Sequence, residues 1–186
     1  MKKASGFTLV ELMLTLTILA VVMAVAIPPM ADFLNRHRNE TQRQRLFDLV
    51  ALARSKAYSE GKIYTLCGST DGEECSGDWS AYILLFVDSN GNHERESDET
   101  IERKISDLPA DASLEWNSLQ DYLQYRPDGH TQRQTGNFKY CPPDGAPDYG
   151  WIIVLNATGR PYFGRDGDGD GIVEDGSGNK LNCAAG

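Results

Sequence analysis

Three patterns of apolar and polar positions follow one another along the chain. Residues 7–27 carry a single charge, Glu11. At about 1.5 Å per residue, a helix over this run is roughly 30 Å long, which matches the hydrocarbon core of a bilayer. A cleaved signal peptide would place a small-residue site after the apolar stretch, whereas here Pro28-Pro29 follows and a helical pattern continues. The first pattern therefore predicts a retained transmembrane helix over 7–29.

The second pattern predicts that the helix continues as an amphipathic segment over 30–60. Its apolar residues stand among arginines and glutamines, and in the second half they follow the three-and-four spacing of one helix face; they are Phe33, Leu34, Leu46, Leu49, Val50, Leu52, Ala53 and Ala57. Pro28 and Pro29 lack an amide hydrogen, so we expect a kink or local melting there. Gly61 is the predicted stop.

The third pattern, over 61–186, consists of short apolar runs separated by Gly, Pro, Asp and Asn turns, which is typical of antiparallel strands. The predicted strands are Ile63–Cys67, Trp79–Val87, Thr100–Ile105, Ser113–Trp116, Tyr122–Arg126, Asn137–Cys141 and Trp151–Asn156. Trp79, Trp116 and Trp151 alternate with apolar residues and are expected to pack in the core. The chain is therefore predicted to be α+β, with a β-rich head packed on the second half of the helix.

The formal net charge of −9 is divided unevenly along the chain. Residues 1–45 contain six basic and three acidic residues and so carry +3, which leaves −12 for the residues from Leu46 onward. A head this acidic repels phosphate backbones, so nucleic acid is a poor default partner.

Four cysteines lie in the predicted head, and none forms a C-x-x-C pair or a cluster with histidine, so zinc spacing is absent. Behind a membrane anchor they indicate two disulfides in an oxidising space such as the periplasm. Three connectivities are possible. We favour Cys67 with Cys75, which closes a short loop, and Cys141 with Cys183, which ties down the tail. The count of basic residues on the two sides of the span would place the head in the cytoplasm, and the cysteines argue against that orientation.

The segment 2–11, KKASGFTLVE, closely resembles the type III signal of the type IV pilin family, in which a basic leader ends in Gly, Phe follows, and Glu is the fifth residue after the cut. The resemblance implies that residues 1–6 are a prepilin leader. It also implies that a membrane aspartyl prepilin peptidase cuts between Gly6 and Phe7 and methylates the new amine of Phe7.

A carboxylate at Glu11 has a physical explanation in such a protein. An ionisable group inside the bilayer costs about 3 kcal/mol on insertion scales, so it persists only where a partner or a function compensates. In an assembled filament, the free amine of a neighbouring subunit's first residue can supply that partner. The alternative is that Glu11 only reaches the headgroups from one end of the span.

Four phrases of the head, ALARSKAYSEGKIYTLC, WSAYILLFVDSNGN, LQYRPDG and IIVLNATGR, resemble the GspH/FimT/FimU minor pilins. The resemblance implies a pilin-like lollipop, in which the long helix carries an antiparallel two-sheet head. It implies a minor pilin that joins or primes a type IV pilus and acts in its assembly, tip complex, motility or adhesion. The alternative is the minor pseudopilin H of type II secretion, and a DNA-binding pilin for uptake is a third candidate.

The same resemblance implies the location and partners of the protein. We expect a single-pass protein of the bacterial inner membrane with a periplasmic head, which later enters a pilus or pseudopilus. Its partners would be other major and minor pilins or pseudopilins, the prepilin peptidase and the membrane.

The tail contains the D-x-D-x-D-G opening of a calcium loop, formed by Asp166, Asp168 and Asp170, in which alternate carboxylates converge on one hard cation. The closing Glu of such a loop is replaced by Ser177, and Glu174 or Asp175 could substitute. The alternative is a solvated acidic loop held by Cys183. No cofactor is required, and Ca²⁺ is a possible ligand.

Two further segments have simpler interpretations. Asp88, Asn90 and Asn92 also alternate, with Glu99 at the twelfth position, but His93 stands where a calcium loop requires Gly, and a hairpin connection is expected. Asn156–Arg160 resembles the Gly-Arg turn of the family.

DNA-binding FimT-like pilins continue that turn as G-R-x-R, whereas Tyr162 stands here in the place of the second Arg. Arg160 is therefore expected to be structural or to contact a subunit. His37, His93 and His130 lie in different predicted elements, and none accompanies a recognisable nucleophile motif. The sequence thus predicts no enzyme.

Overall fold

The computed structural model describes residues 7–106 and 108–183, without the side chains of 25–29 and 31. The predicted leader, residues 1–6, lies outside the described residues, and so does its last residue, Gly6. The chain divides into two compact units, Met1–Arg38 and Asn39–Gly186, and each is described by itself below.

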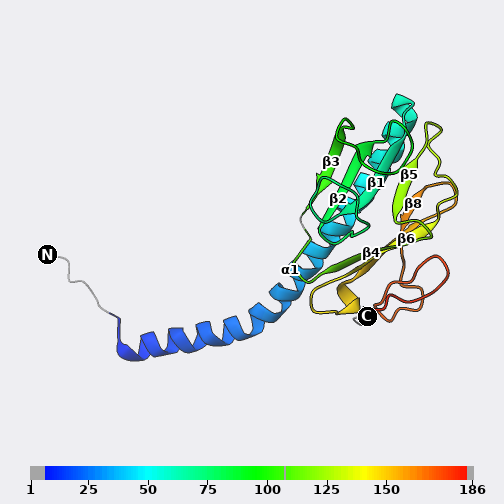
Figure 1. Cartoon of the computed structure of the whole chain (residues 1–186). Coiled ribbons are helices and arrows are strands. Elements are labelled where there is room, and N and C mark those ends of the chain that lie inside the picture. The colour runs from blue at the N-terminus through cyan, green and yellow to red at the C-terminus, as the bar shows by residue number, and fades with distance from the viewer. Residues whose placement is uncertain (1–6, 107, 184–186) are drawn as a thin grey trace. The chain divides into compact units, whose positions relative to one another are not determined.

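The long helix α1 spans Leu9–Glu60 and passes through both units (Figure 1). Its assignment is continuous across Pro28 and Pro29, so the local melting expected there is not seen. The helix ends as predicted at Gly61, which adopts a left-handed φ of 66° and donates its N–H to the carbonyl oxygen of Ala57 at 3.1 Å. Within the described ranges, no helix combines the length and the apolar composition needed to cross a membrane. The transmembrane segment expected over 7–29 stays a prediction.

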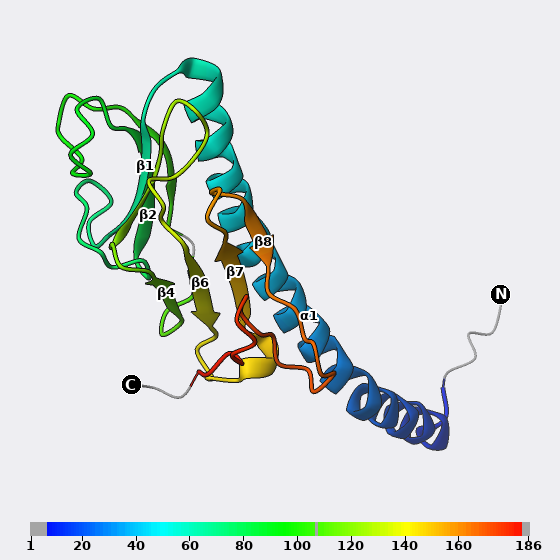
Figure 2. The ribbon, with the colours of Figure 1, turned by 90° about the vertical axis from the view of Figure 1, so that its right-hand side faces the viewer.

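The unit Asn39–Gly186 contains two antiparallel four-stranded sheets (Figures 1 and 2). The first sheet has the order β3-β2-β1-β5, with β1 Tyr64–Ser69, β2 Tyr82–Val87, β3 Ile101–Ile105 and β5 Tyr122–Tyr125. The second sheet has the order β4-β6-β7-β8, with β4 Ser113–Asn117, β6 Gly136–Cys141, β7 Trp151–Leu155 and β8 Pro161–Phe163. A short 3-10 helix, η1, spans Pro147–Tyr149 before β7. The predicted α+β class and antiparallel two-sheet head are confirmed.

The core of this unit lies between the inner faces of the two sheets and the second half of α1. Alternate residues of each strand point inward, as in the pairs Leu66 with Leu85 and Phe138 with Ile153. The helix contributes its predicted apolar face, of which Leu46, Leu49, Val50, Ala53 and Ala57 are buried. The three tryptophans are buried as predicted, at 3%, 9% and 3% exposure for Trp79, Trp116 and Trp151.

Two elements, the 3-10 helix η1 and strand β8, were not predicted. Strand β8 pairs with β7 in the register Leu155 with Pro161 and Ile153 with Phe163. Pro161 follows a Gly-Arg turn and begins the outermost strand of its sheet, a place where the missing amide hydrogen costs no ladder bond. The sequence analysis placed a turn at Asn156–Arg160 and no strand after it, whereas the chain forms a short edge strand there.

Candidate functional site

The start of α1 places the two described residues of the predicted processing and assembly site at an exposed helix end. Phe7 is 85% exposed, and Glu11 lies in the first turn. The backbone N–H of Glu11 donates to Oγ1 of Thr8 at 3.2 Å, so Thr8 caps the helix. Thr8-x-x-Glu11 has the spacing of a capping box, a signal that was present in the sequence and that our sequence analysis missed. A carboxylate here is also favoured by the positive end of the helix dipole.

Both disulfides join the cysteines that the favoured connectivity paired. Cys67, on β1, is bonded to Cys75, and their Cα atoms lie 5.6 Å apart. Cys67 is buried against Leu84 and Phe86 on the outer face of the first sheet. The bond therefore holds the loop after β1 over this face.

The second disulfide joins Cys141, at the end of β6, to Cys183 in the tail, with the Cα atoms 5.5 Å apart. Leu181 of the same tail is buried with Ile152 and Val154 on the outer face of the second sheet. The tail is thus attached by both a covalent bond and an apolar contact.

The acidic tail loop brings together three of its four predicted metal ligands. Oxygens of Asp166, Asp168 and Glu174 lie within 4.8 Å of one another. The two oxygens of Asp166 accept from the N–H groups of Gly169 at 2.7 Å and Gly171 at 2.8 Å. Three carboxylates supply the hard oxygen donors that Ca²⁺ prefers. The donor set fits a calcium ion, with Glu174 in place of the missing twelfth residue.

Lys180 is an unpredicted member of this site. Its Nζ donates to Asp170 and lies 2.6 Å from Oδ2 of Asp168. Lys180 engages both carboxylates, but only that of Asp168 is among the three that converge. Lys180 already neutralises part of the loop, and a bound cation would compete with it.

The ionisation of the loop follows from these contacts. Hydrogen bonds from the N–H groups of Gly171 and Gly169 hold the pKa of Asp166 below its ordinary value. The ammonium group of Lys180 lowers the pKa of Asp168, and the bonds to Asp168 and Asp170 raise the pKa of Lys180. Because these shifts favour the charged forms, Asp166 and Asp168 are carboxylates and Lys180 is an ammonium group near neutral pH.

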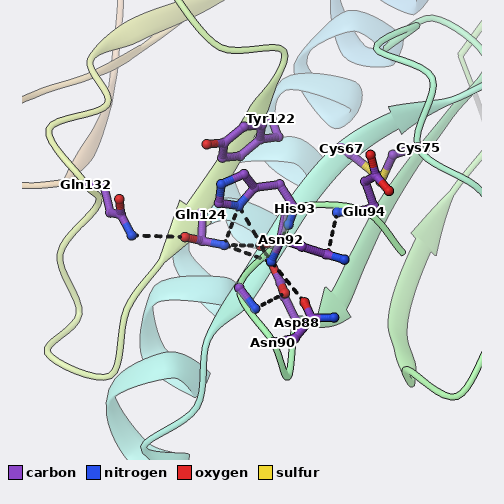
Figure 3. Close-up of polar contacts among 12 residues, drawn as sticks. Cys67, Cys75, Asp88, Asn90, Asn92, His93, Glu94, Tyr122, Gln124 and Gln132 are labelled. Carbon is purple, nitrogen blue, oxygen red and sulfur yellow. Dashed lines mark hydrogen bonds and ion pairs between the residues drawn. A yellow bond between two sulfur atoms is a disulfide. The ribbon is translucent and has the colours of Figure 1, made fainter. Parts of the chain in front are cut away.

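The second alternating segment, which follows β2, forms a buried polar network (Figure 3). The side chain of Asp88 is fully buried, and its Oδ2 accepts from Oγ1 of Thr65 at 2.8 Å and from Nε2 of Gln124 at 2.7 Å. Its Oδ1 accepts from the N–H of Gly91 at 2.7 Å. Because donors on the protein satisfy this carboxylate, the segment is well explained as the expected hairpin connection.

His93 is also part of this network. Its ring stacks on that of Tyr122 with the centroids 3.9 Å apart, and Nδ1 lies 2.8 Å from Nε2 of Gln124. The backbone of His93 has a positive φ of 71°, and its N–H donates to Oδ2 of Asp88 at 3.1 Å. His93 thus occupies the left-handed position that a calcium loop gives to Gly, and it is fixed by stacking.

Comparison with known proteins agrees with this architecture. The sequence model of the family described as Type II transport protein GspH matches residues 42–159, and that of the Prokaryotic N-terminal methylation motif matches residues 1–27. No match was found among curated protein sequences.

Two solved structures show the same fold at low sequence identity. The type IV minor pilin FimU of Pseudomonas aeruginosa is 18% identical, with a TM-score of 0.56 over 72% of this chain and 92% of that one. The minor pseudopilin EpsH from the type II secretion system of Vibrio cholerae is 10% identical, with a TM-score of 0.51 over 73% of this chain and 99% of that one. Together with the family matches, which cover more than half of the sequence, they establish that this chain is a type IV pilin-like protein that belongs to the GspH family of minor pilins and pseudopilins.

Proposed function

We propose that this chain is a minor pilin that joins or primes a type IV pilus. In this proposal, prepilin peptidase cuts between Gly6 and Phe7 and methylates the amine of Phe7. The precursor is held in the bacterial inner membrane by a single pass with its head in the periplasm. The role is architectural and not catalytic, as in the structural proteins that make up the family.

The observation that carries the proposal is the exposed apolar surface of residues 7–34, which are Phe7, Thr8 and the first half of α1. Large apolar side chains there are between 44% and 85% exposed, and they are Phe7, Leu9, Val10, Leu12, Met13, Leu14, Leu16, Ile18, Leu19, Val21, Val22, Met23, Met30, Phe33 and Leu34. Contiguous apolar surface on this scale marks an interaction site. Lipid before assembly and the helices of neighbouring subunits after it would cover this surface.

The second candidate function is that of the minor pseudopilin H of type II secretion, and the description of the matching family favours it. The two functions differ in what deletion of the gene would abolish. Loss of twitching or adhesion supports the pilus. Secreted proteins trapped in the periplasm, with motility intact, support the pseudopilus.

Two substitutions at Glu11 test the assembly role and separate it from helix capping. Glu11→Gln removes the charge but retains a side chain that suits a capping box, whereas Glu11→Val removes both. If the carboxylate pairs with the amine of a neighbouring subunit, both variants should be processed and inserted normally and both should be depleted from sheared filaments. Quantitative immunoblotting of sheared and cell fractions gives the incorporated share.

Thr15→Val serves as the matched control, because it removes a polar group from the same helix without touching the capped turn. The hydroxyl of Thr15 bonds to the carbonyl of Leu12 of its own helix, at 2.8 Å. Normal incorporation of Glu11→Gln together with loss of Glu11→Val would assign Glu11 to capping and contradict the pairing. Normal incorporation of both would leave Glu11 without a role in assembly.

Calcium binding in the tail is a separate proposal. It is supported by the convergence of Asp166, Asp168 and Glu174, and the ammonium group of Lys180 opposes it. When bound, Ca²⁺ would take oxygens of these three residues and stabilise the loop.

A further inference from the structure

A groove of about 490 Å³ lies along the uncovered face of α1 in the unit Asn39–Gly186. Two turns form its other wall, namely the turn after β5 and the turn between β7 and β8. Phe47, Ala51 and Pro161 supply apolar lining, and Arg54 and Arg160 stand along it. A largely apolar groove with a few charged groups is the kind of surface that takes a peptide side chain.

Arg54 is held in place from the side of the turn after β5. Its Nε donates to the carbonyl oxygen of Gly129 at 2.9 Å, which leaves its terminal amino groups as donors. Gly129 has a positive φ of 74°, and its N–H closes the turn onto the carbonyl of Arg126 at 2.8 Å. The guanidinium group is therefore positioned before any partner binds.

Arg160 is held through its backbone. Its N–H donates to Oδ1 of Asn156 at 2.9 Å, and the preceding carbonyl, that of Gly159, accepts from the buried hydroxyl of Tyr125 at 2.7 Å. A Cβ at Gly159 would lie 2.9 Å from the Tyr125 ring, so the turn packs closely on the strand below. The exposed side chain of Arg160 has no hydrogen bond or ion pair within the part of the chain that the structure describes.

The charges around the groove differ from those of the rest of the head. The residues from Leu46 onward carry −12, yet two arginines line this groove. Asp128 also lines the groove, and its ion contact is with Nδ1 of His130 at 3.8 Å, not with either arginine. A guanidinium group binds carboxylates in a bidentate manner. The acidic head repels any anionic partner at long range, and the repulsion grows with the charge of the partner, so a nucleic acid and a second copy of the same head are disfavoured more than a short segment with a few carboxylates.

We propose that this groove docks an acidic polypeptide segment of another filament subunit, with carboxylates on Arg54 and Arg160 and an apolar side chain against Phe47 and Ala51. The identity of the partner as a filament subunit rests on the proposed function. The preference for acidic, apolar peptides rests on the groove alone.

The test uses the full chain in detergent micelles and a fluorescein-labelled peptide, Glu-Asp-Leu-Phe-Asp-Glu. Fluorescence anisotropy should show saturable binding that weakens with salt, and the amide peptide Gln-Asn-Leu-Phe-Asn-Gln should bind at least tenfold more weakly. Arg160→Gln should weaken binding roughly tenfold, because one charge-assisted pair is lost. Arg103→Gln, which removes an exposed arginine from β3, is the matched control and should bind as the parent does.

Five results would overturn the proposal. Equal binding of the two peptides would remove the carboxylates from recognition, and an equal loss in Arg103→Gln would reduce the effect to net charge. Tighter binding of a single-stranded oligonucleotide would point to nucleic acid. Self-association in sedimentation that Arg160→Gln abolishes would make the occupant a second copy. A chain that enters filaments but binds no peptide would refute docking in the groove and leave the proposed function standing. Peptide binding by a chain that is absent from filaments would support docking in the groove and refute the proposed function.

Discussion

Removal of the Cys141–Cys183 disulfide is expected to destabilise the head more than removal of the Cys67–Cys75 disulfide. The Cys141–Cys183 bond closes a loop with a sequence separation of 42, and the Cys67–Cys75 bond closes a loop with a separation of 8. In the chain-entropy model these loops correspond to about 4 kcal/mol and about 2.5 kcal/mol of unfolding free energy. The difference, about 1.5 kcal/mol, comes from the unfolded state alone.

The comparison is made with two double variants, Cys141→Ala/Cys183→Ala and Cys67→Ala/Cys75→Ala. Alanine is chosen because Cys67 is 1% exposed and a serine would bury a hydroxyl group there. Urea unfolding of the full chain in micelles is followed by tryptophan fluorescence, since all three tryptophans are buried in the head.

The larger loss requires that the tail stays docked when its disulfide is absent. Burial of Leu181 against Ile152 and Val154 provides that contact. If the tail detaches instead, the loss is limited to the free energy of docking and the m-value falls, because less surface is exposed on global unfolding. A smaller loss for the Cys141 variant than for the Cys67 variant would refute the reasoning.

Two predictions concern the acidic loop. If calcium binds, a hundredfold excess over its Kd should stabilise the full chain by about 2.7 kcal/mol, and magnesium should stabilise it less. Lys180→Met should enlarge the calcium response, and Asp166→Ala should abolish it. A melting temperature that calcium changes neither in the parent nor in Lys180→Met would refute the site. The lowered pKa of Asp166 means that its stabilising contribution is present above its unfolded pKa, about 3.9, and is lost as the pH falls through the folded value. The amide resonances of Gly169 and Gly171 should therefore shift on acidification in the parent but not in Asp166→Asn, and equal shifts in both would contradict the bonding.

The sequence predicted those features that depend on local pattern. The helix over 9–60 followed from an apolar run in its first half and from apolar spacing in its second half, and it ended at a glycine that takes a left-handed φ. Seven of the eight strands followed from apolar runs between turn residues. These signals are local, because a period or a turn is written within a few neighbouring residues.

The features that escaped prediction are mostly those that folding brings together from distant parts of the chain. Lys180 reaches Asp170 across ten positions, and Gln124 reaches Asp88 across thirty-six, so neither contact has a spacing signature. Strand β8 pairs with the edge that β7 presents, and its three residues are too few to give a strand pattern in the sequence. The Thr8 cap is different, since its spacing was visible and only its meaning was missed.

Mass spectrometry of sheared filaments tests the central claim most directly. Filaments from the native host would be sheared, washed and digested, and peptides of this chain sought with their N-termini intact. The account predicts that the sheared fraction contains this chain and that it begins at N-methylated Phe7. Recovery of the chain only in the cell fraction, with Met1 or an unmethylated N-terminus in cells that process other pilins, would contradict it.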